Sequence, residues 1–122
     1  MTLTEELLSK VKAGAWDCGD AVAALNEERV DQDFGRALGA QMYRGYHAYC
    51  GSLDAAKALH EAVLPEWSWQ VNVLHRVPRG AVWLGSTGDG DLQLFQTDAD
   101  TPARAWLIAI LKALIAKEKA DG

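Results

Sequence analysis

Apolar and polar residues alternate along residues 67–77, the pattern of a β-strand with one buried face. One predicted face carries Trp67, Trp69, Val71, Val73, His75 and Val77, and the other carries Ser68, Gln70, Asn72, Leu74 and Arg76. A second strand is predicted over 81–84 and a third over 92–96. Pro78 and Gly80 bracket the first connection, and Asp89-Gly90 has the residues of a type I′ turn. Residues 67–96 are therefore predicted to form an antiparallel meander.

Helical periodicity flanks this meander on both sides. Ser52 caps a predicted helix that Pro65 ends, and Thr101 followed by Pro102 begins a second helix. The run at 81–84 is apolar on both faces, which predicts helices above and below the sheet. The last helix is apolar over more than half of its circumference, so it forms core or also a subunit interface. The predicted fold is α+β, a three-stranded antiparallel β-meander between helices, with core order α-β-β-β-α and layers α/β/α.

The N-terminal part predicts a helical hairpin. Thr2 and Glu5 have the spacing of a capping box, Gly14 ends the first helix, and Asp17 begins the second. A further short helix is expected around 33–40, followed by a loop. Residues 1–51 are thus predicted to be a helical extension with a Tyr-rich loop, packed on a core domain of residues 52–122.

Composition restricts the function classes. The chain has 122 residues, 49 % of them hydrophobic, as expected for one globular domain. Its net charge of −5 disfavours non-specific binding to phosphate groups. Its two cysteines form no paired CxxC motif, which favours a reducing cytosol over a disulfide framework. The N-terminus lacks the basic region of a signal peptide, and no apolar run is long enough to span a membrane. A soluble cytoplasmic protein is expected.

One segment combines aromatic and reactive side chains, namely Tyr43, Tyr46, His47, Tyr49 and Cys50. It is either a structural segment with buried rings and solvated hydroxyls, which the composition favours, or a ligand or partner site. A metal at His47 and Cys50 would need further ligands that the neighbouring sequence lacks. The run 88–91 lacks the remaining ligands of a calcium loop. No metal or other cofactor is expected.

The sequence contains no catalytic motif, so no catalytic residue is assigned. The candidate groups for an enzyme are Cys18, His47, Cys50, Asp54, His60 and His75. His60 falls beside the polar face of its helix, which predicts a solvated side chain. His75 falls on the apolar face of the first strand, which predicts a hydrogen-bonded structural histidine. A Cys50–His75 nucleophile pair would require these residues to meet in the fold.

Nucleic-acid binding is an alternative, because the predicted core order is also that of double-stranded RNA-binding domains. Arg44, Arg76 and Arg79 could form a small basic patch. Such domains need a basic start to the last helix, and here Arg104 is accompanied by acidic residues at 98 and 100. The charges therefore disfavour nucleic acid as the partner.

Three groups of residues resemble a known family: Leu53-Asp54-Ala55-Ala56, then Leu64-Pro65 with Trp67 and Trp69, then Thr101-Pro102-Ala103-Arg104-Ala105. Through these residues, the stretch Ser52–Ala116 is similar to the phage ABA-sandwich domain family. The members of this family are small phage or prophage proteins without an assigned activity. The resemblance implies helices on two faces of a small antiparallel sheet. It also implies a non-enzymatic accessory protein of a bacterial host cell that acts through protein–protein binding or self-association, for example as a homodimer.

Overall fold

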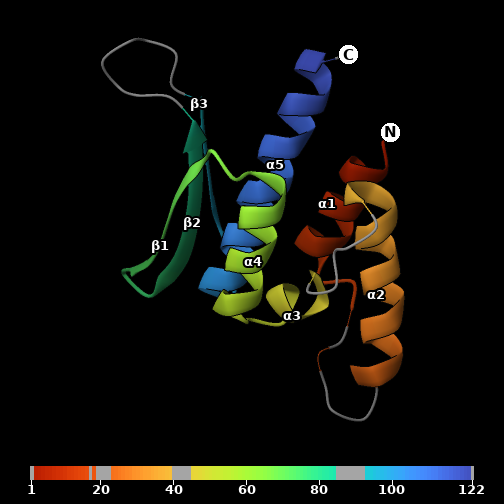
Figure 1. Ribbon diagram of the computed structural model, residues 1–122. Helices are drawn as coiled ribbons and strands as arrows, with labels where there is room; N and C mark the ends of the chain where they lie inside the picture. Colours follow the sequence, from red (N-terminus) through yellow and green to blue (C-terminus); the bar gives the residue numbers. More distant parts are fainter. Residues whose placement is uncertain (1, 17, 19–22, 40–44, 85–92, 122) are drawn as a thin grey trace.

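The structure, a computed structural model, describes residues 2–16, 18, 23–39, 45–84 and 93–121 (Figure 1). These ranges contain five helices and three strands: α1 (Leu3–Ala13), α2 (Ala23–Leu38), α3 (Gly45–Tyr49), α4 (Leu53–Val63), β1 (Ser68–Leu74), β2 (Val77–Leu84), β3 (Gln93–Asp98) and α5 (Pro102–Asp121). The α+β class and the predicted helix–three strands–helix order of the core are confirmed. The Asp89-Gly90 turn lies outside the described residues.

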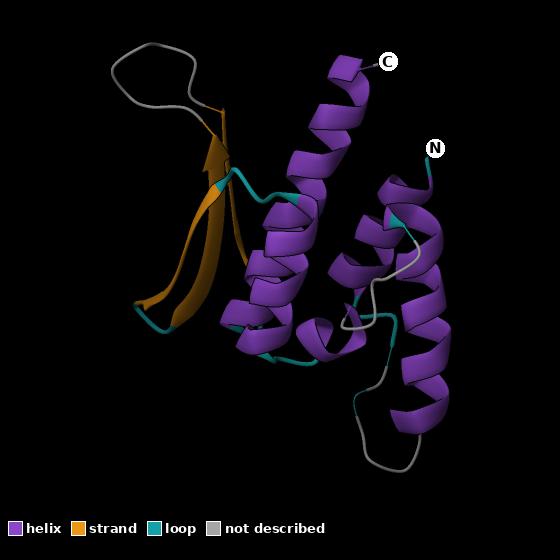
Figure 2. Cartoon of the chain, in the orientation of Figure 1, coloured by secondary structure: helices purple, strands orange, loops and turns teal. Residues whose placement is uncertain are grey.

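The strands form an antiparallel sheet in the order β1-β2-β3, and the described helices lie over one of its faces (Figure 2). This differs from the predicted α/β/α layers, because helices cover one face where two were expected. Val82 is buried on the same side as Gly80, which rests on α5. Ala81 and Trp83 point to the opposite side and are only half-buried. The apolar run in β2 therefore does not indicate a sheet with two covered faces.

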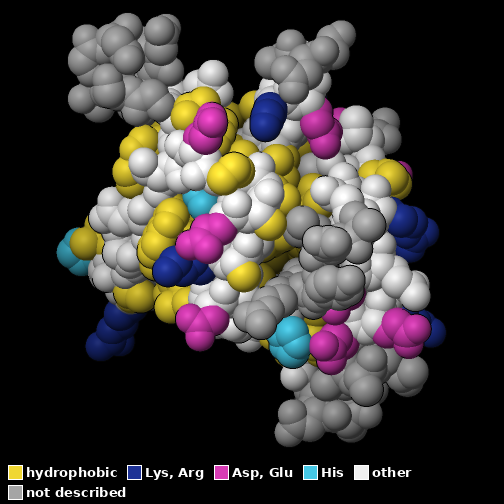
Figure 3. All heavy atoms as spheres, viewed as in Figure 1, with side chains coloured by type: hydrophobic (Ala, Val, Ile, Leu, Met, Phe, Trp, Pro, Cys, Tyr) yellow, Lys and Arg dark blue, Asp and Glu magenta, His cyan; other side chains and the backbone are white. Residues whose placement is uncertain are grey.

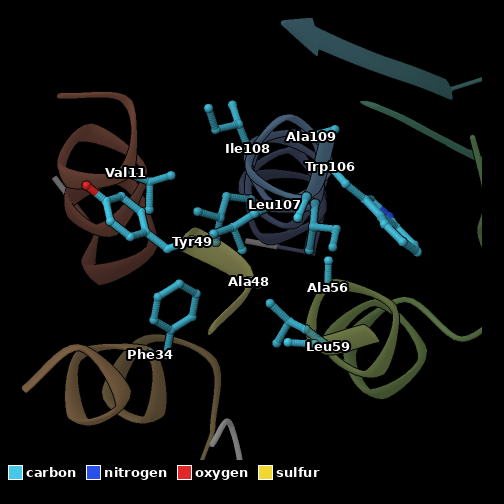
Figure 4. Packing of buried hydrophobic residues seen from close by; sticks show 14 of the residues in the cluster. Val11, Phe34, Ala48, Tyr49, Ala56, Leu59, Trp106, Leu107, Ile108 and Ala109 are labelled. Atoms are coloured by element: carbon cyan, nitrogen blue, oxygen red, sulfur yellow. The ribbon is translucent and has the colours of Figure 1, made fainter. Parts of the chain in front are cut away.

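Helix α5 lies at the centre of the molecule, between the sheet and the other helices (Figure 4). Thr101 caps it, since its Oγ1 accepts a hydrogen bond from the backbone N–H of Arg104 at 3.1 Å. Its buried side chains are Ala103, Ala105, Trp106, Leu107, Ile108, Ala109, Ile110, Leu111 and Ala113. A helix in this position needs apolar residues all round. Packing within the chain therefore accounts for the apolar circumference of α5. A subunit interface, the other explanation considered for it, is not needed.

The N-terminal helices pack on the far side of α5 from the sheet (Figure 1). The predicted capping box is present, with the backbone N–H of Glu5 donating to Thr2 Oγ1 at 3.1 Å. The second helix differs from the prediction. It runs from 23 to 38 without a break at Gly35, whereas a start at Asp17 and a separate helix at 33–40 were expected. Val30 and Phe34 are fully buried, and this shared apolar face favours one continuous helix.

The turn between β1 and β2 consists of His75 and Arg76, which both have positive φ, at 51° and 66°. Two such residues between paired strands form a type I′ turn. The predicted strand continued to Val77, so its end is corrected to Leu74. His75 consequently lies in an exposed turn and not on the apolar face of a strand. His75-Arg76 is neither an Asn-Gly nor an Asp-Gly pair, and the apolar alternation continues across the turn.

Replacing Arg76 by glycine is expected to stabilise the protein by about 1 kcal/mol, since a left-handed conformation costs an L-residue roughly this much. Urea unfolding monitored by circular dichroism measures the change. Arg76→Ala is the matched control, because it removes the same side chain but keeps the Cβ. Equal stability of the glycine and alanine variants would contradict the assigned turn.

Candidate functional site

Two tyrosines of the segment, Tyr46 and Tyr49, belong to the core. Tyr46 is 4 % exposed and Tyr49 is 1 % exposed. The Tyr49 hydroxyl donates to the carbonyl oxygen of Trp16 at 2.7 Å and accepts from its backbone N–H at 3.2 Å. The guanidinium of Arg104 lies 4.0 Å from the centre of the Tyr49 ring, and its Nε donates to the Tyr49 carbonyl. These contacts join α3 to α5 and to the segment after α1, while Tyr43 lies outside the described residues.

The reactive side chains of the same segment also have partners. His47 is exposed, and its Nε2 lies 3.0 Å from Glu27 Oε1. Cys50 forms a disulfide with Cys18, so neither cysteine is a free thiol and a Cys50–His75 nucleophile pair cannot form. The sequence favoured no disulfide, whereas the fold brings together and joins two cysteines separated by 32 positions. Since disulfides are typical of oxidising compartments, the cysteines do not support the predicted reducing cytosol.

Two negative findings concern only the part of the chain that the structure describes. It contains no group of three or more His, Cys, Asp or Glu side chains placed to hold a metal ion. It also contains no helix with the length and apolarity required to cross a membrane. The remaining enzyme candidate, Asp54, lies exposed in the first turn of α4.

His60 is 2 % exposed, so the predicted solvated position is wrong. Its Nδ1 accepts from the indole N–H of Trp106 at 3.2 Å, and its Nε2 therefore carries the proton and donates to the Trp67 carbonyl at 2.8 Å. Burial lowers the pKa of His60, although the Trp67 carbonyl and nearby Glu61 favour the charged ring. This neutral histidine connects α4, α5 and the start of the sheet, and it acts as a structural group.

We expect the buried neutral His60 to make the protein less stable as the pH falls below about 6.5, the usual pKa of histidine. There the unfolded chain binds a proton that the folded chain excludes, so the free energy of unfolding decreases by up to about 1.4 kcal/mol per pH unit. Urea unfolding of wild type and His60→Gln at several pH values measures this contribution. Titrations elsewhere cancel in the comparison, including that of Asp31, whose pKa burial raises. The same pH dependence in both proteins would contradict it.

Of the predicted basic patch, the structure describes Arg76 and Arg79. Arg79 Nε lies 3.0 Å from Asp98 Oδ1, an ion pair that neutralises its charge on the sheet. Arg76 is exposed in the hairpin turn, and Arg44 lies outside the described residues. Arg104 is held by Tyr49 and by Asp100, whose Oδ2 lies 3.3 Å from its Nη1. The start of α5 therefore presents no free arginine to a nucleic acid.

The described helices leave one face of the sheet uncovered, the face opposite α5. We call it the open face. The strand register places its side chains in three rows, Ser68–Trp83–Leu94, Gln70–Ala81–Gln96 and Asn72–Arg79–Asp98, with Leu74 and Val77 beside the turn. The rows that contain Gln70 and Asn72 line a shallow depression of about 70 Å³. Amide groups at its centre can donate and accept hydrogen bonds, and apolar side chains flank them at both ends.

The exposed apolar residues give the open face its chemical character. Leu94 is 51 % exposed, Leu74 is 47 % exposed and Val77 is 36 % exposed. An antiparallel sheet with a solvated face normally alternates apolar-in and polar-out. Here large apolar residues point outward, while none of the described side chains on this face forms a nucleophile–base pair. This arrangement suits a binding surface.

The sequence contained part of this site. Alternation in the first strand marked Ser68, Gln70 and Asn72 as a polar face. It did not show that this face would remain uncovered, because that depends on where the helices pack. Searches of known proteins add no further information: no family model matches this chain, and neither does any curated protein or solved structure.

Proposed function

We propose that this protein is a non-enzymatic binding module that acts through protein–protein contacts on the uncovered side of its sheet. The observation that carries the proposal is the one-sided sheet, whose open face exposes Leu74, Val77 and Leu94 around a row of amides. Protein–protein interfaces combine the burial of apolar side chains with direct hydrogen bonds, and the open face offers groups of both kinds. The ion pair between Arg79 and Asp98 leaves the open face without net charge, which suits a protein partner better than a polyanion.

The fate of the candidate catalytic groups supports a binding role. Both cysteines are joined in a disulfide, and His60 is buried between a carbonyl and an indole. His47 and His75 lie on the surface, and neither belongs to a described group of three or more side chains placed to hold a metal ion. The two cysteines and His60 thus have structural positions, and the other two histidines are exposed to solvent.

An accessory role in a phage or prophage is part of the proposal, and its support is the sequence resemblance of residues 52–116. That resemblance implies a sheet covered on two faces. The described helices of this chain cover one, so the surface available for a partner is larger than the family architecture implies. The binding proposal rests on this uncovered surface and does not require a phage origin.

Capture of partners from native cells tests the proposal. Tagged wild type is compared with Leu94→Lys, which places a charge on the open face. Leu3→Lys is the matched control, because Leu3 is 54 % exposed but lies on α1. We expect Leu94→Lys to reduce recovery of a specific protein by about tenfold or more, as loss of a contact residue does, and Leu3→Lys to leave it unchanged.

Two results would contradict the proposal. Equal recovery with wild type and Leu94→Lys would show that the open face does not bind the partner. Recovery of nuclease-sensitive nucleic acid without protein would instead support the alternative module with double-stranded-RNA-binding-like topology. In that case, an electrophoretic shift lost in Arg76→Ala and Arg79→Ala would confirm that alternative.

A further inference from the structure

No described strand pairs with the outer edge of β1. In the part of the sheet that the structure describes, β1 is an edge strand that pairs only with β2 (Figure 1). All of its residues are exposed except Val71, which is half-buried. Figure 3 shows hydrophobic side chains gathered on this side of the molecule. Trp69 remains 38 % exposed although it stacks on Trp106, and Val73 is 59 % exposed.

The turn defines which backbone groups point outward from this edge. In a two-residue hairpin the flanking residues, here Leu74 and Val77, exchange both backbone hydrogen bonds. Bonded and non-bonded pairs then alternate along the strand. The backbone N–H and C=O groups of Trp69, Val71 and Val73 therefore point away from β2. No backbone hydrogen bond from these three residues to another described segment is present.

The usual protections of an edge strand are absent from β1. Natural proteins guard such edges with lysine, proline, an inward-pointing charge or a bulge. The sequence of β1, Ser-Trp-Gln-Val-Asn-Val-Leu, contains no charged residue and no proline, and its register with β2 is continuous. The opposite edge strand, β3, ends with Asp98, which is ion-paired to Arg79. The β1 edge is thus the better prepared of the two for pairing with another strand.

We propose that two copies of this chain pair antiparallel along β1, about a twofold axis at Val71. This inference goes beyond the proposed function, because it names a second copy as the partner and places it at the β1 edge, whereas the proposed function concerns the open face. The outward-pointing residues are symmetric about Val71, so Val71 would face Val71 of the second copy and Trp69 would face its Val73. Each of these pairs exchanges two backbone hydrogen bonds. The two three-stranded sheets become one continuous sheet.

Side chains match in the same register. On the α5 side, the exposed rings and methyl groups of Trp69 and Val73 cover each other. On the open face, the amide of Gln70 lies opposite that of Asn72, and the two can donate to and accept from each other. No like charges meet, because β1 has none. A twofold interface needs this self-complementarity, in which residue i contacts j and j contacts i.

Light scattering after size-exclusion chromatography tests the pairing on the full chain. Wild type is expected at about twice its 13.3 kDa mass. Val73→Pro removes an outward N–H without removing a bond to β2, so it is expected to give a folded monomer. Leu94→Lys is the control that alters the open face but leaves the β1 edge intact, and it is expected to remain dimeric. Circular dichroism confirms that each variant is folded.

A second measurement tests the register. Val71→Cys would introduce the only free thiol, since the two native cysteines are bonded to each other. Bonded antiparallel pairs have Cα atoms about 5.5 Å apart, within the range of a disulfide. Oxidation should therefore cross-link Val71→Cys into dimers and leave Gln93→Cys on β3 monomeric on a non-reducing gel.

A monomeric wild type would overturn the inference, as would a dimer that Val73→Pro leaves intact and that Val71→Cys fails to cross-link. Either result leaves the proposed function open to its own test, because partner capture with Leu94→Lys depends on the open face and not on the β1 edge. Conversely, a β1-paired dimer whose open face captures no partner would uphold the self-pairing alone.

Discussion

Gly80→Ala is expected to destabilise the protein by about 3 kcal/mol or more, the upper part of the range for overpacked cores. A Cβ at this position would lie 2.4 Å from the backbone nitrogen of Trp106, 2.5 Å from its Cα and 2.7 Å from the carbonyl carbon of Ala105. These are helix backbone atoms, so no side-chain rotation can relieve the contact. Helix α5 would have to move away from β2 and open the core.

The expected loss of stability distinguishes Gly80→Ala from an ordinary Gly→Ala substitution. Gly→Ala in a regular element ordinarily stabilises by roughly 0.5–1 kcal/mol, because alanine loses less backbone entropy on folding. Gly35→Ala in α2 is the matched control, since nothing lies within 4 Å of its added Cβ, and it should show that ordinary gain. Urea unfolding measures both variants. A stabilised Gly80→Ala would show that α5 does not rest on this part of β2.

Removing the disulfide should cost about 3–4 kcal/mol in the double variant Cys18→Ser, Cys50→Ser. The bond closes a loop across 32 positions, and the chain-entropy relation for a loop of that length gives about 3.7 kcal/mol. The loss arises mainly in the unfolded state, which gains freedom when the cross-link is absent. In the folded state the bond fastens the segment after α1 to the residue that follows α3, beside the Tyr49–Trp16 contacts.

Equilibrium unfolding with and without a reductant measures this contribution. Reduced wild type should unfold at the same urea concentration as the double serine variant, and the reductant should not affect that variant. A variant within about 0.5 kcal/mol of oxidised wild type, the range of neutral surface changes, would contradict the prediction. The comparison also shows whether the fold persists in a reducing compartment.

The sequence was sufficient where local rules decide the structure. Thr2 with Glu5, and Thr101 followed by Pro102, locate two helix starts, because a cap satisfies backbone N–H groups within one turn. Period-two alternation located β1 and identified its polar side, which became part of the open face. The order of helices and strands from α4 to α5 followed from these signals, and the α+β class followed from that order.

Tertiary structure alone decided which surfaces were buried and which residues met. The Cys18–Cys50 bond, the burial of His60 beneath Trp106 and the contact of Gly80 with α5 all join segments far apart in the chain. Alternation along a strand distinguishes its two faces, but it does not say whether a helix covers each one. The open face and the open β1 edge exist because α5 occupies one side of the sheet and the other described helices pack behind it. Single-residue patterns report local preferences, whereas these features depend on the packing of whole elements.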